Sequence, residues 1–227
     1  MSLPAPRFDS TTRETRLIVI LEQAFLETVK HKEKYQLLNV DDHHVTLKKT
    51  HRPPEAARPD ITHQALLALL DSPLNKAGLL EVWVHTANNV IIRIDPSVRL
   101  PRTFKRFCGL IVQLLHKMVI RADDSNRKLL HVVKGPLIKH IPADIPIVLL
   151  SRVAGEPVSL KELALRLTKE QQPPTCQPIA VVIGAIAHGH ISIEYATEKV
   201  SISNYALSAA AVASRLCTAF EEVWSVL

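Results

Sequence analysis

The stretch that decides the fold is Ile179-Ala180-Val181-Val182-Ile183-Gly184, an unbroken apolar run that ends at a glycine. A run in which successive residues are all apolar is typical of a strand buried on both faces of a parallel sheet. A second run of this kind, Leu17-Ile18-Val19-Ile20-Leu21, lies near the other end of the chain. The two runs therefore predict buried strands of one mainly parallel sheet.

Further strands and helices alternate between these two runs. Residues 80–84 and 90–94 flank the turn sequence Thr86-Ala87-Asn88-Asn89, which predicts a β-hairpin. Other predicted strands span 35–40, 129–133 and 147–150, and predicted helices span 62–70, 103–119, 159–168 and 207–226. Polar, proline-containing stretches at 41–59 and 170–178 are expected to be loops. The alternation predicts an α/β fold with an inserted hairpin, the insertion covering about 41–100.

The composition is compatible with a polyanionic partner and predicts an aliphatic core. The 227 residues carry 28 Lys and Arg against 22 Asp and Glu, a net charge of +6 that attracts phosphate but is common in other proteins too. Aromatic residues make up 4%, which weighs against base stacking as the main binding mode. Residues 1–15 are polar and expected to be flexible, and no run approaches the ~20 apolar residues of a membrane span. We expect a soluble, intracellular protein.

Cysteine and histidine usage predicts neither a disulfide framework nor a metal site. The three cysteines, Cys108, Cys176 and Cys217, are far apart and lack ligand spacing, which favours a reducing compartment. The run Asp41-Asp42-His43-His44 has suitable residue types, but it lacks a spacing such as HExxH and is predicted to be a polar loop.

A basic surface is predicted around Arg99-Leu100-Pro101-Arg102-Thr103-Phe104-Lys105-Arg106-Phe107. A helix from here to residue 119 places one set of residues on an apolar stripe: Phe104, Phe107, Cys108, Ile111, Leu115 and Met118. Arg102, Arg106, Gln113 and Lys117 then fall on the opposite face. Guanidiniums held over a packed stripe suit phosphate recognition, but a solvated helix face explains the same pattern.

Two other segments are candidates for a ligand cradle. The segment Gly184-Ala185-Ile186-Ala187-His188-Gly189 follows a buried strand and holds two of the six glycines, which indicates a tight turn or a close approach to a ligand. It is neither a dinucleotide nor a P-loop fingerprint. The second segment, Ile202-Ser203-Asn204-Tyr205-Ala206-Leu207-Ser208, has cap-type residues before the last helix, and simple capping accounts for them equally well.

The third candidate is the segment that begins Arg58-Pro59-Asp60 and continues past Asp71. Asp60 and Thr62 are both candidates for the helix N-cap, and Pro73 is expected to end the helix. An aspartate can orient a nearby arginine or accept a proton, so both roles stay open for Asp60. On one helix Asp60 and Asp71 lie about 16 Å apart, too far to act as paired carboxylates.

Four segments together resemble the ribosome-biogenesis pseudouridine N1-methyltransferase family of the SPOUT class, with wording closer to its eukaryotic branch. They are RPDITHQALLALLDSPLNKAG at 58–78, RLPRTFKRFCGLIVQLLHK at 99–117, VVIGAIAHG at 181–189 and SISNYALSAA at 201–210. The resemblance covers residues 16–227 as a single domain and implies a SPOUT fold with a C-terminal trefoil knot. It further implies S-adenosylmethionine as methyl donor, a hairpin loop of small-subunit rRNA as substrate, and a homodimer in the nucleus and nucleolus. Ribosome assembly factors are further candidate partners.

The resemblance also assigns roles to residues. RNA contact falls on Arg58, Arg99, Arg102 and Arg106, and the aspartate that steadies the first arginine is Asp60. Cofactor contact falls on Leu150, Gly184, Gly189, Ile202, Ser203, Asn204, Tyr205, Ala206 and Leu207. Asp60 and Asp71 are the candidates for the acceptor of the N1 proton. Ala206 stands where the family usually has proline, and residues 152–178 match too poorly for any role to be transferred.

Two other functions stay open. One is a non-catalytic RNA-binding assembly factor whose cofactor pocket is vestigial, and the other is a protein-binding scaffold. The last helix carries small residues followed by apolar bulk, which suits either a dimer contact or packing within one subunit; these residues are Ser208, Ala209, Ala210, Ala211, Ala213, Ser214, Leu216, Phe220 and Trp224.

Overall fold

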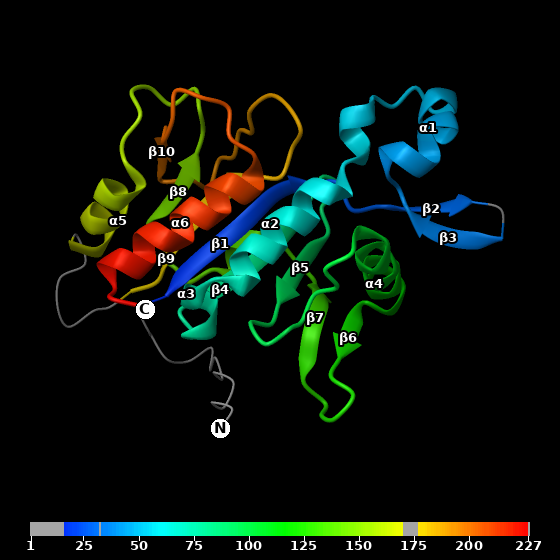
Figure 1. Ribbon diagram of the computed structural model, residues 1–227, viewed down its shortest axis with the longest axis horizontal. Coiled ribbons are helices and arrows are strands. Elements are labelled where there is room, and N and C mark those ends of the chain that lie inside the picture. Colours follow the sequence, from blue (N-terminus) through cyan, green and yellow to red (C-terminus); the bar gives the residue numbers. More distant parts are fainter. Residues whose placement is uncertain (1–15, 32, 170–176, 227) are drawn as a thin grey trace.

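The computed structural model describes residues 16–31, 33–169 and 177–226 and shows one large sheet flanked by helices (Figure 1). The expectations for residues 1–15, for Cys176 and for most of the 170–178 loop lie outside this described part.

The main sheet has eight strands in the order β10-β8-β9-β1-β4-β5-β7-β6. Its parallel part consists of β10 (Glu198–Val200), β8 (Ile147–Leu150), β9 (Ile179–Gly184), β1 (Leu17–Ala24) and β4 (Leu80–Thr86). Its antiparallel part consists of β5 (Ile91–Ile94), β7 (Lys128–Val133) and β6 (Val119–Arg121). The predicted α/β fold with a mainly parallel sheet is thus confirmed.

Strand β1 shows why the apolar runs are continuous. Leu17, Val19 and Leu21 belong to the core on one face of the sheet, whereas Ile18 and Ile20 belong to the core on the other face, and all five are 0% exposed. Successive side chains of a strand point to opposite faces, so a strand with two buried faces needs apolar residues at every position. Neighbouring β9 repeats this pattern in register with β1.

The predicted hairpin is present but is built into the main sheet. β4 and β5 pair antiparallel, with Val82 opposite Ile94, while the other edge of β4 pairs parallel with β1. The segment 41–100 therefore contributes a central strand. The limits of an insertion, the single-domain boundaries and the trefoil knot stay predictions.

Helices α2 (Pro59–Asp71) and α6 (Ala209–Val223) lie side by side over one face of the sheet, and α5 (Leu160–Lys169) lies beside α6 (Figure 1). The predicted capping box opens α5: the Ser159 hydroxyl accepts from Glu162 N at 3.1 Å, and Ser159 N donates back to Glu162 Oε2 at 3.3 Å. Leu216 and Phe220 of α6 are fully buried within the chain. They have no surface left for a dimer contact, so packing within the subunit explains this apolar bulk.

The expectation of a loop over 41–59 is wrong. Residues here form α1 (Val40–Lys49) and the short 3-10 helix η1 (Pro54–Ala57), which pack in a small lobe with the hairpin β2 (Thr28–His31) and β3 (Lys34–Leu37). Asn39 caps α1 by accepting from Asp42 N at 2.9 Å. Acidic residues in the first turn and lysines in the last turn complement the helix dipole. The polar composition hid this helix because little of it is buried.

Several predicted boundaries move as well. α2 begins at Pro59, with Arg58 in the N-cap position, and ends at Asp71. Ser72 caps both helices, so Pro73 opens the short helix α3 (Pro73–Lys76) rather than ending α2. α4 (Phe104–Lys117) ends because Met118 adopts φ 61°; Met118 is 55% exposed and not part of the apolar stripe. α6 begins two residues later than predicted. β2, β6 and β10, each three or four residues long, were not predicted.

No helix within the described ranges has both the length and the apolar character that crossing a membrane requires.

Candidate functional site

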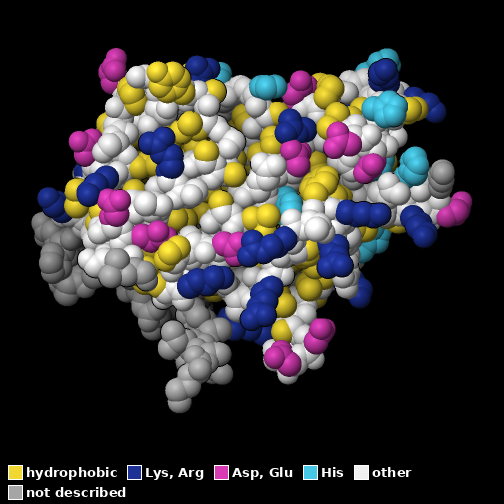
Figure 2. All heavy atoms as spheres, viewed as in Figure 1, with side chains coloured by type: hydrophobic (Ala, Val, Ile, Leu, Met, Phe, Trp, Pro, Cys, Tyr) yellow, Lys and Arg dark blue, Asp and Glu magenta, His cyan; other side chains and the backbone are white. Residues whose placement is uncertain are grey.

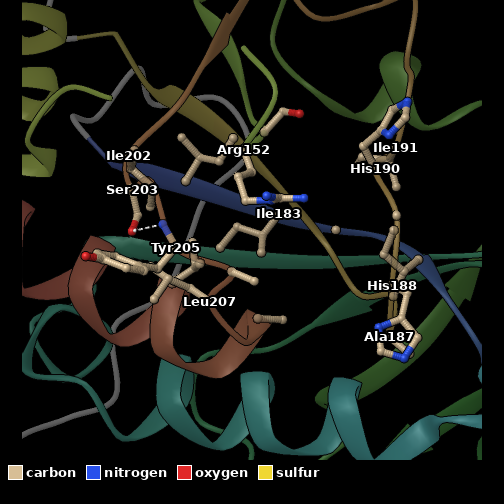
Figure 3. Close-up of a pocket in the computed structure, with 18 residues that line it drawn as sticks. Arg152, Ile183, Ala187, His188, His190, Ile191, Ile202, Ser203, Tyr205 and Leu207 are labelled. Carbon is tan, nitrogen blue, oxygen red and sulfur yellow. Dashed lines mark hydrogen bonds between the residues drawn. The ribbon is translucent and has the colours of Figure 1, made fainter. Parts of the chain in front are cut away.

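A cavity of about 270 Å³ opens where the parallel strands β8 and β9 end (Figure 3). Leu150 ends β8 and Gly184 ends β9, and both line the cavity. The opposite wall is the segment before α6, together with the first turns of that helix. The carboxyl edge of a parallel sheet is where open α/β folds bind ligands, and this cavity lies just below the usual 300–1,000 Å³ of small-molecule sites.

The structure brings together the two segments proposed as ligand cradles, although they are separated in the sequence. The residues predicted to hold a cofactor line this one cavity with a single exception: Leu150, Gly184, Gly189, Ile202, Ser203, Tyr205, Ala206 and Leu207. The exception is Asn204, which is exposed to solvent and is not part of the lining. Tyr205 is 80% exposed at the rim of the cavity.

Capping accounts for part of the segment before α6. Ser208 is the N-cap of this helix, because its hydroxyl accepts from Ala211 N at 3.2 Å. The Ser203 hydroxyl accepts from Tyr205 N at 3.0 Å and holds a tight turn beside the cavity (dashed line in Figure 3). Ser203 therefore shapes the cavity wall rather than the helix end.

Four polar lining residues were not among the predicted cofactor contacts: Ser151, Arg152, His188 and His190. The Arg152 side chain extends between the two walls, and both histidines belong to the loop that follows β9 (Figure 3). The two histidines flank Gly189, so their position beside a glycine turn was the available signal. Arg152 lies in the poorly matching segment 152–178, where no sequence pattern pointed to it.

The two glycines of the cavity have different structural reasons. Gly189 has φ +88°, a conformation that L-residues rarely adopt, and a Cβ there would meet nothing within 4 Å. A Cβ on Gly184 would lie 3.6 Å from side-chain atoms of Ile186 and Ile191, which is an ordinary contact. The backbone conformation at position 189 therefore favours glycine. At position 184, contacts within the chain leave room for a side-chain Cβ.

Arg58 and Asp60 form a two-pronged ion pair at the start of α2. Arg58 Nε donates to Asp60 Oδ1 at 2.8 Å, and Arg58 Nη2 donates to Oδ2 at 2.7 Å. The hydrogen bond to Asp60 raises the pKa of the Arg58 guanidinium above its ordinary value. Both side chains stay about one third exposed, so the guanidinium is held in a fixed direction and still reachable from solvent.

Asp71 lies at the other end of α2 and pairs with Arg102, whose Nη1 is 2.8 Å from Asp71 Oδ2. Neither Asp60 nor Asp71 lines the cavity. Each carboxylate instead holds an arginine that was predicted to contact RNA, and this geometry favours the steadying role for Asp60 over that of proton acceptor.

The loop that carries Arg99 and Arg102 is attached to α2. His63 is buried, its Nε2 lies 2.8 Å from Pro101 O, and its ring stacks on Phe107 with centroids 4.3 Å apart. Arg99, Arg102 and Arg106 are exposed. Lys and Arg side chains gather on this face over the region of α3 and α4 (Figure 2). The apolar side of α4 is thus buried and its basic side faces solvent, as predicted.

Burial makes both described thiols unreactive, because it raises the pKa of Cys108 and of Cys217 to about 11. Within residues 16–31, 33–169 and 177–226, no three His, Cys, Asp or Glu side chains are grouped so that they could hold a metal ion.

Comparison with known proteins places this geometry in a family. The model of the EMG1/NEP1 methyltransferase family matches residues 19–221. The chain is 52% identical over 212 residues to the human ribosomal RNA small subunit methyltransferase NEP1, covering 93% of this chain and 83% of that protein. It is 50% identical to the Drosophila melanogaster protein of the same name, covering 94% of this chain and 84% of that protein. Nep1 of Pyrococcus furiosus is 32% identical, covering 87% and 84%.

A solved structure agrees with these relatives. The crystal structure of Archaeoglobus fulgidus Nep1 bound to S-adenosylhomocysteine matches with a TM-score of 0.74 at 28% identity, covering 92% of this chain and 98% of that one. Over the aligned residues, the human and Drosophila relatives are 52% and 50% identical to the chain and the Pyrococcus relative is 32% identical, which confirms the closer resemblance to the eukaryotic branch. The chain belongs to the EMG1/NEP1 methyltransferase family.

Proposed function

We propose that this protein transfers the methyl group of S-adenosylmethionine to N1 of a pseudouridine in a hairpin loop of small-subunit rRNA, as a step in small-subunit biogenesis. The observation that carries the proposal is the cavity itself. Two segments separated in the sequence, 184–189 and 202–208, meet at the carboxyl ends of β8 and β9, in a chain whose relatives are named small-subunit rRNA methyltransferases. A related chain of the same fold binds S-adenosylhomocysteine.

The lining residues fit such a cofactor. Small and aliphatic residues, among them Gly184, Ala187 and Leu207, leave backbone accessible to a ligand, and Arg152 and Ser203 add polar groups. When bound, the cofactor supplies a methyl group already activated on a sulfonium. The chain then has to place the acceptor nitrogen in line with that methyl group, which lowers the barrier by several kcal/mol.

The exposed arginines supply the RNA contacts in this proposal. Arg58 is aimed by Asp60, Arg102 is paired with Asp71, and Arg99 and Arg106 extend the basic surface. A planar guanidinium binds phosphate through two parallel hydrogen bonds, so a fixed orientation lowers the entropy cost of binding.

The proposal includes a homodimer and a location in the nucleus and nucleolus. The dimer is supported by apolar surface beside the cavity: Tyr205 is 80% exposed and Val153 is 63% exposed, on adjoining loops that a second copy of the chain would cover.

Calorimetric titration with S-adenosylmethionine, combined with RNA binding over a range of salt concentrations, tests the proposal. A methyltransferase binds both, and its RNA affinity falls steeply with salt. Binding of RNA without cofactor would indicate the assembly factor, and binding of neither would indicate the scaffold.

A further inference from the structure

The loop that follows β9, residues 185–195, supplies one wall of the cavity but contains no helix or strand. Its lining residues run from Ile186 to Ile191 and include Gly189 with its left-handed backbone. A loop without internal ladder hydrogen bonds takes its shape from contacts with the rest of the chain. The contacts at its two ends, together with the buried side chain of Ile191, therefore decide where the cavity wall lies.

A single residue of the central strand, Glu22, contacts both ends of this loop. At the start of the loop, Ala185 N donates to the main-chain oxygen of Glu22 at 2.8 Å. At its end, the Tyr195 hydroxyl donates to Oε2 of the Glu22 side chain at 2.5 Å. Glu22 lies opposite Gly184 in the parallel register of β1 and β9. The two ends of the loop, Ala185 and Tyr195, are ten peptide bonds apart in the chain, and both are hydrogen-bonded to Glu22.

The Glu22 side chain is a buried charge with a partner of opposite sign. It is only 6% exposed, and its Oε1 lies 2.7 Å from the buried Nδ1 of His85 at the end of β4. The other ring nitrogen, Nε2, lies 2.8 Å from Asn89 Oδ1. Both nitrogens therefore lie close to side-chain oxygens, and the contact with Glu22 raises the pKa of His85 above its ordinary value. A hydrogen bond from Tyr195 to this carboxylate is charge-assisted and shielded from water.

We propose that Glu22 is a positioning residue of the cofactor site, which holds the loop 185–195 on the sheet through Tyr195 and so fixes the cavity wall from Ile186 to Ile191. The inference rests on the proposed function, because it assumes that the cavity takes S-adenosylmethionine. A wall that is ordered before binding spares the ligand the cost of ordering it. Breaking the Tyr195 contact therefore weakens cofactor binding although neither Glu22 nor Tyr195 lines the cavity.

Tyr195→Phe is the sharpest test, because it removes one hydroxyl and leaves the ring. A hydrogen bond to a charged acceptor is worth roughly ten- to a hundredfold in an equilibrium constant. We expect S-adenosylhomocysteine to bind about tenfold more weakly by calorimetry. In the ligand-free protein, cleavage by proteinase K within 185–195 becomes about tenfold faster, while amide hydrogen exchange in β1, β4 and β9 does not change. Tyr35→Phe, at an exposed tyrosine of β3, is the matched control and leaves both measurements at the wild-type value.

Glu22→Gln separates this role from a general loss of stability. The amide oxygen can still accept from Tyr195, and its NH₂ can donate to a neutral His85, so the contacts persist without charge. Its affinity for S-adenosylhomocysteine should lie between those of the wild type and Tyr195→Phe. If Tyr195→Phe binds within twofold of the wild type and its loop is cleaved at the wild-type rate, the inference is wrong. If the wild type itself does not bind the ligand, the proposed function fails, and the cleavage rates still decide whether Glu22 holds the loop.

Discussion

Replacing Asp60 by asparagine tests the assignment of the Arg58–Asp60 pair. The substitution keeps the size of the side chain and one oxygen acceptor, but it removes the charge and one of the two hydrogen bonds, at 2.8 and 2.7 Å. It also places an NH₂ group against a guanidinium that has no acceptor. Arg58 then loses its fixed direction.

The magnitude follows from the exposure of the pair. Arg58 and Asp60 side chains are 36% and 30% exposed, so solvent screens the pair, which contributes roughly 0.2–1 kcal/mol to stability. The negative charge in the first turn of α2 adds about 0.3–1 kcal/mol through the helix dipole. We expect the free energy of unfolding to fall by about 1 kcal/mol, which lowers Tm by roughly 2–4 °C in a chain of this size. Reordering Arg58 on RNA costs about 1 kcal/mol, or roughly fivefold in RNA affinity.

Two assays with one matched control distinguish the roles of Asp60. Fluorescence anisotropy gives the RNA affinity, and single-turnover methylation with RNA in large excess gives the rate when binding is saturated. Under the steadying role, affinity falls about fivefold and the saturated rate is unchanged. Asp124→Asn, at an exposed position of the turn before β7, is the control and should leave stability, RNA affinity and the saturated rate unchanged. A hundredfold drop in the saturated rate of Asp60→Asn, with RNA affinity intact, would refute our reasoning and identify a proton acceptor.

Four other substitutions have expected outcomes. Arg102→Ala and Arg106→Ala each weaken RNA binding and lower the slope of log affinity against log salt by up to about one unit. The change is smaller for Arg102, because Asp71 already offsets its charge. Unchanged slopes in anisotropy titrations would mean that the basic side of α4 is an ordinary solvated helix face. Gly189→Val forces a branched side chain into φ +88°, so S-adenosylmethionine binding is lost in calorimetry while the circular dichroism spectrum stays folded; normal binding would exclude this loop from the site. Glu22 raises the pKa of His85 above its ordinary 6.5, so the stabilisation of the fold by this pair is fully present below about pH 6.5 and is lost as pH rises through the folded-state pKa. Urea unfolding from pH 6 to 9 should show that the difference in unfolding free energy between the wild type and His85→Gln shrinks as pH rises. A difference that stays constant would contradict the pair.

The sequence predicted those parts of the fold in which neighbouring residues share one environment. The runs in β1 and β9 are apolar at every position because both faces are buried, and α4 shows a clear apolar stripe. The three-residue strand β10 and the polar helix α1 escaped prediction because a long-range pairing and an Asn39 cap, rather than periodicity, stabilise them.

In the candidate site too, contacts between neighbours in the sequence could be predicted, and contacts between distant segments could not. Arg58 and Asp60 are two residues apart, so their pairing was predictable from the sequence. Asp71 and Arg102 are far apart in the chain, and their contact depends on how α2 meets the loop before α4. Residue types alone marked both cavity walls as candidate ligand cradles, and the family resemblance then assigned the individual cofactor positions. That the two walls meet could not be predicted, because both are irregular segments whose shape depends on tertiary contacts such as that of Tyr195 with Glu22.

The central claim is methyl transfer from S-adenosylmethionine to a pseudouridine of small-subunit rRNA. The most direct measurement is mass spectrometry of two synthetic hairpins after incubation with the protein and the cofactor, identical except for pseudouridine or uridine at one loop position. We predict one added methyl group on the pseudouridine hairpin and none on the uridine hairpin. A pseudouridine hairpin that stays unmethylated, although the protein binds both it and the cofactor, would contradict the claim.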